Sequence, residues 1–530
     1  MNASAAAAVV PISTRVMNLS HFVTQAARRN PASIAFVWGS KNWTWRELDR
    51  RINAMAHALV NRYGVLKGDR ILVHSQNCNQ MFESMFACFR VGAVWVPTNF
   101  RQTPEEVVYQ ARASGAVGMI CGNMFGGHRA ACAAADTRIG FFISIGDSAF
   151  GSDYDAVVAE HNGDQIESAT VYRDDPCWFL FTSGTTGRPK IVVLTHGQMA
   201  FVVASHLCDL MPGTTADDAS LVVAPLSHGA GVHQLTQVAR GAKTILLPTE
   251  RFDAESAWAL VEQWRVTNIF TVPTILKLLV EHPAVDRYDH SSLRHVVYAG
   301  APMYRVDQKL ALSKLGPVLV QYFGLGEVTG NITVLPPNFH RIDDGEDARI
   351  GTCGFERTGM QVTIRTPGGE EVAQGETGEI CVIGPAVFPG YYDSPEANEL
   401  AFRDGWFRTG DVGHMDAEGF LYITGRASDM YISGGSNIYP REIEEKILTH
   451  PDISEVAVLG VPDPLWGEVG VAVCVAKKEA NIQSIDLDSW LHDKIARYKL
   501  PRKYVFWDEL PKSGSGKIAK KTIFEKLGGG

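Results

Sequence analysis

A run of nine residues in the middle of the chain has the composition of an anion-binding loop. It reads Thr-Ser-Gly-Thr-Thr-Gly-Arg-Pro-Lys at positions 182–190, and strand-like apolar runs flank it at 178–181 and 191–194. Backbone N–H groups, hydroxyls and the Lys190 ammonium can converge on one anion in such a connection. The common nucleotide-binding loop needs Ser or Thr after its lysine, whereas Ile191 stands here. The sequence therefore predicts a phosphate loop of another kind, and a Ser/Thr/Gly-rich hairpin connection is the alternative.

This run resembles the signature loop of the adenylate-forming superfamily, which comprises acyl- and aryl-CoA synthetases, peptide-synthetase adenylation domains and luciferases. Further stretches match that superfamily in order and approximate spacing, namely 300–302, 321–327, 405–411, 426–429, 433–440 and 511–517. The resemblance extends from about residue 19 to residue 526. Agreement at one motif can arise by chance, but agreement at six cannot reasonably do so.

The resemblance implies an ATP and AMP site built from many of these residues. Asp411 and Arg426 correspond to the ribose contacts, and Phe323 to the aromatic face against adenine. Glu327 and Thr185 correspond to the ligands of a Mg²⁺ ion on the phosphates, an ion that prefers oxygen ligands. The implied nucleotide contacts are Thr182, Ser183, Gly184, Thr185, Thr186, Gly187, Lys190, Gly300, Ala301, Pro302, Gln321, Tyr322, Phe323, Gly324, Gly326, Asp411 and Arg426. Taken alone, Asp411 is more typical of a turn aspartate.

The acyl pocket is implied by a second set of matches: His228, Val232, Tyr298, Gly300 and Gly324. His228 follows Pro-Leu-Ser and corresponds to a histidine at the pocket mouth, although a lone histidine among apolar residues is more often a packed core residue. We assign it to substrate contact, since attack of a carboxylate on phosphate needs no general base. The expected walls at 230–234, 297–299 and 328–332 contain no Arg or Lys. They favour a medium-chain fatty acid or an aromatic monocarboxylic acid over a dicarboxylate.

The C-terminal matches concern CoA and catalysis. The CoA contacts implied are Gly434, Gly435, Trp466, Lys499 and Arg502, and a solvated charged loop is the alternative for the basic pair. Lys517, on a Ser/Gly-rich loop, corresponds to the catalytic lysine of adenylation, which neutralises charge on the α-phosphate. Ser428 stands at the hinge, where the family usually has Asp or Lys, and Gly326 stands where it usually has Thr.

The elements that must position these residues have an α/β pattern. Strand-like runs at 70–74, 93–97, 118–121, 269–272 and 295–299 alternate with amphipathic helical segments at 45–59, 81–91, 105–114 and 254–265. Such alternation predicts parallel sheets in a large, multi-layer N-terminal domain. Short strands at 362–366, 378–383 and 420–423 predict a small β subdomain within it. The domains expected are a disordered extension 1–17, a large domain 18–425, a hinge 426–429 and a mobile α+β domain 430–530.

Composition excludes several other classes. The 530 residues carry a net charge of −9 without a Lys/Arg block, which argues against a nucleic-acid partner. Nine scattered cysteines, with no Cys-x-x-Cys, indicate buried thiols in a reducing compartment. No run approaches 18 apolar residues, and the N-terminus lacks the basic start of a signal peptide. We therefore expect a cytoplasmic enzyme with no membrane span, and the homodimer is the default oligomeric state for such a protein.

The function implied is that of an acid–CoA ligase. A carboxylic acid and ATP give acyl-AMP and pyrophosphate, and CoA then displaces AMP to give acyl-CoA. The alternatives are an adenylation enzyme that loads a carrier protein, a luciferase-like oxidising enzyme, and a non-catalytic acyl or nucleotide sensor. Joint presence of Lys190, Glu327, Asp411, Arg426 and Lys517 argues against the sensor.

Overall fold

Alternating strands and helices in the first part of the chain build a mostly parallel seven-stranded sheet. The computed structural model describes residues 14–146, 151–182, 189–249, 252–301, 303–345, 348–426, 429–433, 436–478, 480, 482–492, 494–512 and 518–528. The strands are, in spatial order, β11 (Lys190–Thr195), β10 (Pro176–Thr182), β5 (Val94–Pro97), β4 (Arg70–His74), β6 (Gly118–Gly122), β7 (Phe141–Ile145) and β8 (Ser152–Asp153). All neighbours are parallel except β10 and β11, which form an antiparallel hairpin at one edge.

A second, nine-stranded sheet lies beside the first in the large domain. In spatial order it contains β18 (Phe355–Glu356), β17 (Thr333–Leu335), β16 (Leu319–Phe323), β15 (His295–Tyr298), β14 (Asn268–Thr271), β12 (Ala219–Val222), β13 (Lys243–Leu246), β2 (Ile34–Trp38) and β3 (Lys41–Thr44). Its six central strands, from β16 to β2, are parallel, and antiparallel strands cover both edges. This is the arrangement that the alternating pattern predicts.

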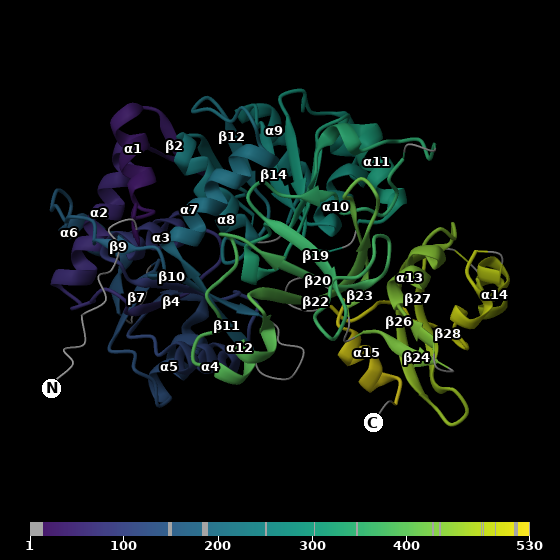
Figure 1. Ribbon diagram of the computed structural model, residues 1–530. Helices are drawn as coiled ribbons and strands as arrows, with labels where there is room; N and C mark the ends of the chain where they lie inside the picture. The colour runs from purple at the N-terminus through teal and green to yellow at the C-terminus, as the bar shows by residue number, and fades with distance from the viewer. Residues whose placement is uncertain are drawn as a thin grey trace, which may run out of the picture.

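Helices pack on and between these sheets (Figure 1). In the large domain they are α1 (His21–Arg29), α2 (Trp45–Asn61), α3 (Asn79–Val91), α4 (Pro104–Ser114), α5 (Gly126–Ala134), α6 (Tyr154–Glu160), α7 (His196–Ser205), α8 (Gly229–Arg240), α9 (Ala254–Trp264), α10 (Pro273–Glu281), α11 (Arg305–Leu315) and α12 (Pro395–Ala401). Every residue of α3 is buried, and its apolar side chains share one core cluster with residues of both sheets. The predicted multi-layer α/β domain is therefore confirmed.

Local sequence sets where these helices begin and end. At the start of α2 the Thr44 hydroxyl accepts from the Glu47 N–H, while the Glu47 carboxylate accepts from the Thr44 N–H. The same capping box opens α4 with Thr103 and Glu106, and Gly115 ends that helix in the left-handed region. These groups satisfy backbone donors and acceptors that a helix end leaves unpaired.

The β subdomain follows, as the change in sequence pattern predicts. It consists of β19 (Gln361–Arg365), β20 (Gly378–Ile383), β22 (Trp406–Met415) and β21 (Phe402–Arg403), with β23 (Leu421–Arg426) also paired to β22. Near the N-terminus, β1 (Arg15–Val16) pairs with β9 (Val171–Tyr172). Ordered structure thus begins before residue 18, the boundary that the sequence predicts for the large domain.

The C-terminal domain is a smaller α+β unit, at the right of Figure 1. Its sheet contains β25 (Ser436–Ile438), β24 (Tyr431–Ser433), β27 (Gly467–Ala476), β26 (Ile453–Asp463) and β28 (Lys503–Phe506), covered by α13 (Pro440–Ile447), α14 (Ser484–His492) and α15 (Lys520–Lys526). The core clusters of the large domain contain no residue beyond Leu421, and those of the small domain begin at Tyr431. Ser428, the predicted hinge residue, lies outside the described residues.

The structure bears on two expectations from composition, that the cysteines are buried and that no segment spans a membrane. Eight of the nine cysteines are buried, but Cys208 is exposed. In the part of the chain that the structure describes, no helix is both long and apolar enough to span a bilayer.

Candidate active site

The predicted phosphate loop connects the two strands of the β10–β11 hairpin. Thr182 ends β10 and lies opposite Lys190, which begins β11. The hydroxyl of Tyr109, on α4, donates to the Pro189 carbonyl at 2.8 Å and so fixes one end of the connection. The predicted contacts Ser183, Gly184, Thr185, Thr186 and Gly187 lie outside the described residues.

A buried carboxylate and a lysine meet on either side of one tyrosine. Glu327 is only 6% exposed, and its Oε1 accepts a 2.9 Å hydrogen bond from the Tyr391 hydroxyl. The Lys190 ammonium lies 4.4 Å from the centroid of the same tyrosine ring. Burial and the nearby Glu327 carboxylate raise the pKa of Tyr391, so the hydroxyl keeps its proton and acts as the donor. The structure thus brings together two predicted residues 137 positions apart in the sequence, Lys190 and Glu327.

The segment 388–392 positions this tyrosine. The N–H of Phe388 donates to the Glu327 carbonyl at 2.8 Å, and the N–H of Tyr392 donates to the Ile191 carbonyl at 3.0 Å. Asn398 binds both the N–H and the carbonyl of Tyr391. Sequence reasoning missed Tyr391. The signal available was a Pro-Gly turn followed by two tyrosines, which predicts a turn but not the residue that the tyrosine contacts.

Gly326, the departure from the family pattern, is explained by a neighbour on β10. A Cβ atom at position 326 would lie 2.8 Å from Leu180 Cδ2 and 3.9 Å from Thr182 Cγ2. Leu180 therefore occupies space that a larger residue at 326 would need. Thr329 has a left-handed backbone, with φ of 49°, and its carbonyl accepts from the Asn331 amide at 3.1 Å.

The predicted ribose contacts are brought together. Asp411 on β22 and Arg426 on β23 are register partners, and Arg426 Nε lies 3.1 Å from Asp411 Oδ1. Asp411 is 5% exposed, so its carboxylate is held close to a guanidinium at the edge of the β subdomain.

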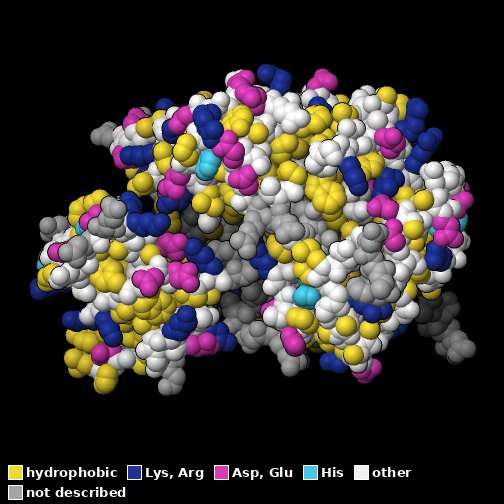
Figure 2. Space-filling view, turned by 180° about the vertical axis from the view of Figure 1, so that it is seen from behind, with side chains coloured by type: hydrophobic (Ala, Val, Ile, Leu, Met, Phe, Trp, Pro, Cys, Tyr) yellow, Lys and Arg dark blue, Asp and Glu magenta, His cyan; other side chains and the backbone are white. Residues whose placement is uncertain are grey.

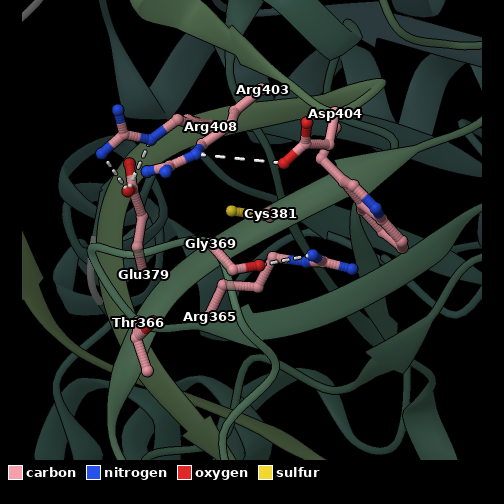
Figure 3. A pocket seen from close by; sticks show the side chains of 9 residues that line it. Arg365, Thr366, Gly369, Glu379, Cys381, Arg403, Asp404 and Arg408 are labelled. Atoms are coloured by element: carbon pink, nitrogen blue, oxygen red, sulfur yellow. Dashed lines mark hydrogen bonds and ion pairs between the residues drawn. The ribbon is translucent and has the colours of Figure 1, made fainter.

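Glu379 anchors the turn that presents Asp411. Its carboxylate accepts from Arg408 Nε at 2.8 Å and from the Gly410 N–H at 3.2 Å. The Thr409 hydroxyl donates to the Ile380 carbonyl at 2.7 Å and accepts from the Asp411 N–H at 3.1 Å. Figure 3 shows Arg408 and Glu379 pointing toward each other at a small pocket of this subdomain. The position of the Asp411 backbone therefore depends on Glu379 and Thr409.

Two predicted acyl-pocket residues, Tyr298 and Gly300, lie at the end of β15. Gly300 follows β15 with φ of 83°, a left-handed conformation that suits glycine, and Ala301 lies next to it. Pro302 lies outside the described residues. Tyr298 packs in the core cluster on the other face of the sheet from Val297. Its hydroxyl donates to Gln321 at 3.0 Å.

The structure therefore does not place Tyr298 with the other acyl-pocket residues. Successive residues of a strand point to opposite faces, so Val297 and Tyr298 cannot line the same pocket. Gln321, predicted as a nucleotide contact, has its side-chain oxygen directed to the buried Tyr298 hydroxyl.

The predicted acyl-pocket residue Val232 lies in an apolar region with a predicted nucleotide contact. Val232 on α8 and the nucleotide candidate Tyr322 on β16 belong to the core cluster that contains Phe270, whose ring stacks on Tyr322 with centroids 6.1 Å apart. Phe323 packs against the same cluster. A Cβ at Gly324 would lie 2.5 Å from Gly330 Cα, so the backbone of the strand and of the 328–332 segment touch here.

His228 precedes α8 at the edge of this region. Its Nδ1 lies 2.8 Å from the Ser227 hydroxyl, and the ring is half-buried. The Asn77 side chain accepts from the Leu226 N–H at 2.8 Å and donates to the Ala224 carbonyl at 2.9 Å, which holds the chain before His228 in place.

Asn331 is a polar residue in the same apolar surroundings. It is fully buried, and its amide nitrogen donates to the carbonyls of Val328 and Thr329 at 3.4 and 3.1 Å. Its Oδ1 has no hydrogen-bond partner among the described residues. Carbonyls require the amide nitrogen to face them, so the oxygen is the unpaired atom. Arg357 braces the segment, because its N–H donates to the Ile332 carbonyl at 3.0 Å.

The predicted CoA contacts have different partners in the structure. Trp466 lies at the tip of the β26–β27 hairpin, 42% exposed, and the Arg502 guanidinium is 5.4 Å from its ring centroid. Lys499 instead forms an ion pair with Glu442 at 2.7 Å. Gly434, Gly435 and the catalytic candidate Lys517 lie outside the described residues. The face in Figure 2 is hollowed between the two domains.

Comparison with known proteins matches this arrangement. Residues 23–392 match the profile of the AMP-binding enzyme family, and residues 442–517 match the AMP-binding enzyme C-terminal domain. The chain belongs to the AMP-binding enzyme family. The predicted superfamily is thereby confirmed, as is the predicted class of an AMP-forming acid–thiol ligase.

Individual relatives cover this AMP-binding enzyme almost completely. A feruloyl-CoA synthase of Amycolatopsis sp is 37% identical over 97% of the chain and 100% of the relative. An indoleacetate–CoA ligase of Aromatoleum aromaticum is 32% identical over 96% of the chain and 98% of the relative. The solved o-succinylbenzoate CoA synthetase of Bacillus subtilis, in complex with its acyl-adenylate intermediate, superposes with a TM-score of 0.83 at 29% identity. That superposition covers 96% of the chain and 98% of the solved chain.

Removal of the Tyr391 hydroxyl should weaken adenylate formation. In Tyr391→Phe the ring beside Lys190 remains, but Glu327 loses its hydrogen bond. A hydrogen bond to a charged group contributes about 1.5–3 kcal/mol, so we expect a loss of roughly tenfold to a hundredfold in pyrophosphate exchange. The Mg²⁺ concentration for half-maximal rate should rise as well.

The neighbouring Tyr392→Phe is the matched control. The Tyr392 ring packs on Phe179 with centroids 4.8 Å apart, and this contact does not need the hydroxyl. Equal losses in the two variants would contradict a specific role of the Tyr391 hydroxyl.

Proposed function

We propose that this enzyme activates a hydroxylated aromatic monocarboxylic acid, of the hydroxycinnamate or hydroxybenzoate type, and transfers it to CoA. The observation that carries the proposal is the unpaired Oδ1 of buried Asn331 in an otherwise apolar, aromatic region. The name of the similar feruloyl-CoA synthase, at 37% identity against 32% for a long-chain-fatty-acid–CoA ligase, supports the aromatic class over a fatty acid.

The walls of the proposed pocket suit a planar ring. Phe270 and Tyr322 stack with an interplanar angle of 18° and present flat apolar faces. A Cβ at Gly229 would lie 2.8 Å from the Phe270 ring, and one at Gly330 would lie 2.3 Å from the Tyr322 ring. Glycines at both positions therefore let the backbone pack directly against these two rings, which fixes their orientation in the proposed pocket wall.

Asn331 gives the proposed pocket one hydrogen-bond acceptor. An unpaired buried carbonyl costs about 1–3 kcal/mol, and a phenolic hydroxyl of the substrate would satisfy it. The amide is held in place, since its nitrogen is bound to the carbonyls of Val328 and Thr329. A fatty acid would leave the oxygen unpaired, so it should bind less well.

In the proposed first step, the substrate carboxylate attacks the α-phosphorus of ATP, and pyrophosphate leaves. Lys190 balances phosphate charge at the hairpin, and Lys517 is proposed to bridge the carboxylate and the α-phosphate. Glu327 fits a Mg²⁺ site, because a single carboxylate beside substrate phosphates is a usual donor set for that ion. When bound, the ion would neutralise charge on the phosphates. Asp411 and Arg426 would hold the ribose.

In the second step the CoA sulfur attacks the acyl carbon. The sulfur reacts as the thiolate, its proton having passed to solvent; the bond from the acyl carbon to the AMP oxygen breaks, and AMP leaves with that electron pair. Trp466 and Arg502 are proposed to contact the CoA nucleotide, by stacking and by charge. Rotation of the small domain about residues 426–429 between steps would let Lys517 and the CoA elements serve in turn.

An acid panel tests the function directly. AMP release with Mg·ATP and CoA should be greatest with ferulate and 4-hydroxycinnamate, lower with cinnamate, and lowest with octanoate and malonate. Release that needs CoA identifies the acceptor. If octanoate were the best substrate, or if the aromatic acids gave pyrophosphate exchange that CoA did not influence, the proposal would be wrong.

Substitution of Asn331 separates substrate recognition from general damage. In Asn331→Leu, kcat/KM for 4-hydroxycinnamate should fall about tenfold, the effect of losing about 1.4 kcal/mol, whereas cinnamate should be turned over as well as before. Asn331→Asp, which keeps an acceptor, should retain part of the preference. The exposed Asn42→Ala is the control. Equal losses for both acids would assign Asn331 a structural role only.

Lys517→Ala should separate the two steps. We expect adenylate formation to fall by about 10²–10³, the usual effect of removing one electrostatic donor, while supplied acyl-AMP is still converted to acyl-CoA. The measurement is pyrophosphate exchange beside single-turnover thioester formation, with the exposed Lys521→Ala as control. Equal loss of both steps would refute this division of roles.

A further inference from the structure

A group of metal-ligand side chains lies on α2 and the turn after α6, apart from every residue assigned to ATP, acid or CoA. It consists of His57 on α2, His161 directly after α6, and Asp164 three residues later. One ligand atom of each lies within 4.8 Å of the others. Across the described residues, no other set of three or more His, Cys, Asp or Glu meets that condition.

One distance equals the ligand spacing of a tetrahedral zinc site, and the other is a hydrogen bond that a metal ion would have to lengthen. His57 Nδ1 lies 3.4 Å and His161 Nδ1 lies 2.9 Å from the same oxygen, Asp164 Oδ2. With metal–ligand bonds of about 2.0–2.2 Å, neighbouring ligand atoms of a tetrahedral zinc ion are roughly 3.3–3.5 Å apart. The two imidazole centroids are 5.1 Å apart, and the Nδ1 atom of each ring faces the same Asp164 oxygen.

The backbone holds these side chains in place. The Asp164 N–H donates to the His161 carbonyl at 3.1 Å, which closes a turn and puts both side chains on one side of it. On α2, Asn53 lies one turn before His57 and so on the same face. The Asn53 side chain donates to the Asp164 carbonyl and accepts from the Ile166 N–H at 3.4 Å. The turn is therefore bonded to the helix that carries His57.

Two imidazole nitrogens of the group lack hydrogen bonds. His57 Nδ1 and His161 Nε2 are both buried atoms with no hydrogen-bond partner among the described residues, whereas His161 Nδ1 bonds to Asp164 Oδ2, a contact that an ion between them would replace. The Asp164 carboxylate is 46% exposed, which leaves one side of the group open to solvent. Two neutral imidazoles and a carboxylate carry one negative charge, and imidazole with carboxylate is a usual ligand set for zinc.

We propose that His57, His161 and Asp164 bind a zinc ion, with water in the fourth position. The ion would join α2 to the turn after α6 and stabilise this part of the large domain. Since metal binds the folded arrangement only, free zinc at 100 times its dissociation constant should raise the folding equilibrium constant about 100-fold.

Zinc titration of the full chain tests the site. The Cys208→Ser protein, which lacks the one exposed thiol, is stripped of metal by chelation and dialysis and titrated with ZnCl₂ in a calorimeter. One equivalent should bind, and the unfolding temperature should rise with zinc. Elemental analysis after dialysis against trace zinc should also give one ion per chain.

Variants decide whether these residues hold the ion. His57→Ala, His161→Ala and Asp164→Asn should each lose the bound equivalent and the rise in unfolding temperature. His492→Ala, which changes an exposed histidine at the end of α14, should keep both. Asp164→Asn changes a half-exposed residue and should fold even if a histidine variant does not. Absence of binding in the parent protein, or retention of binding in Asp164→Asn, would overturn the proposal.

Discussion

The candidate active site depends on the hydrogen bond from Tyr391 to the buried carboxylate of Glu327. A carboxylate removed from water needs a donor or a cation, or it becomes costly to bury. Tyr391 supplies the donor, and its ring also lies beside the Lys190 ammonium. The same segment bonds through its backbone to β11 and to the Glu327 carbonyl. The β10–β11 hairpin and the Glu327 carboxylate are therefore held as one unit, although they come from distant parts of the chain.

Local sequence was sufficient to predict the elements but not the contacts between them. β4 and β20 begin and end where the apolar runs at 70–74 and 378–383 do, because residue alternation and flanking polar groups act within a few positions. The pairing of Glu327 with Tyr391 spans 64 residues and depends on tertiary packing. The unpaired oxygen of Asn331 is equally invisible in the sequence, since its burial follows from the fold.

Strand geometry also separates two residues of the predicted pocket wall. The expected wall 297–299 assumed that consecutive residues line one cavity, whereas a strand sends neighbours to opposite faces. Val297 and Ala299 share the cluster with Phe270, and Tyr298 lies on the other side with Gln321. The two predicted CoA contacts Arg502 and Lys499 look alike in the sequence because both are basic. In the structure Arg502 lies beside the Trp466 ring, whereas Lys499 forms an ion pair with Glu442.

The exposed Cys208 is the one thiol of this enzyme that is accessible for chemical labelling. Eight other thiols are buried, and desolvation raises the pKa of several of them, including Cys381 to about 11, so they react slowly with alkylating reagents. Cys208 lies next to Asp209, which binds the backbone N–H of Thr358 and the guanidinium of Arg357. Arg357 in turn contacts the segment that carries Asn331. A fluorophore attached to this one sulfur would therefore report on the segment that carries Asn331, through Asp209 and Arg357.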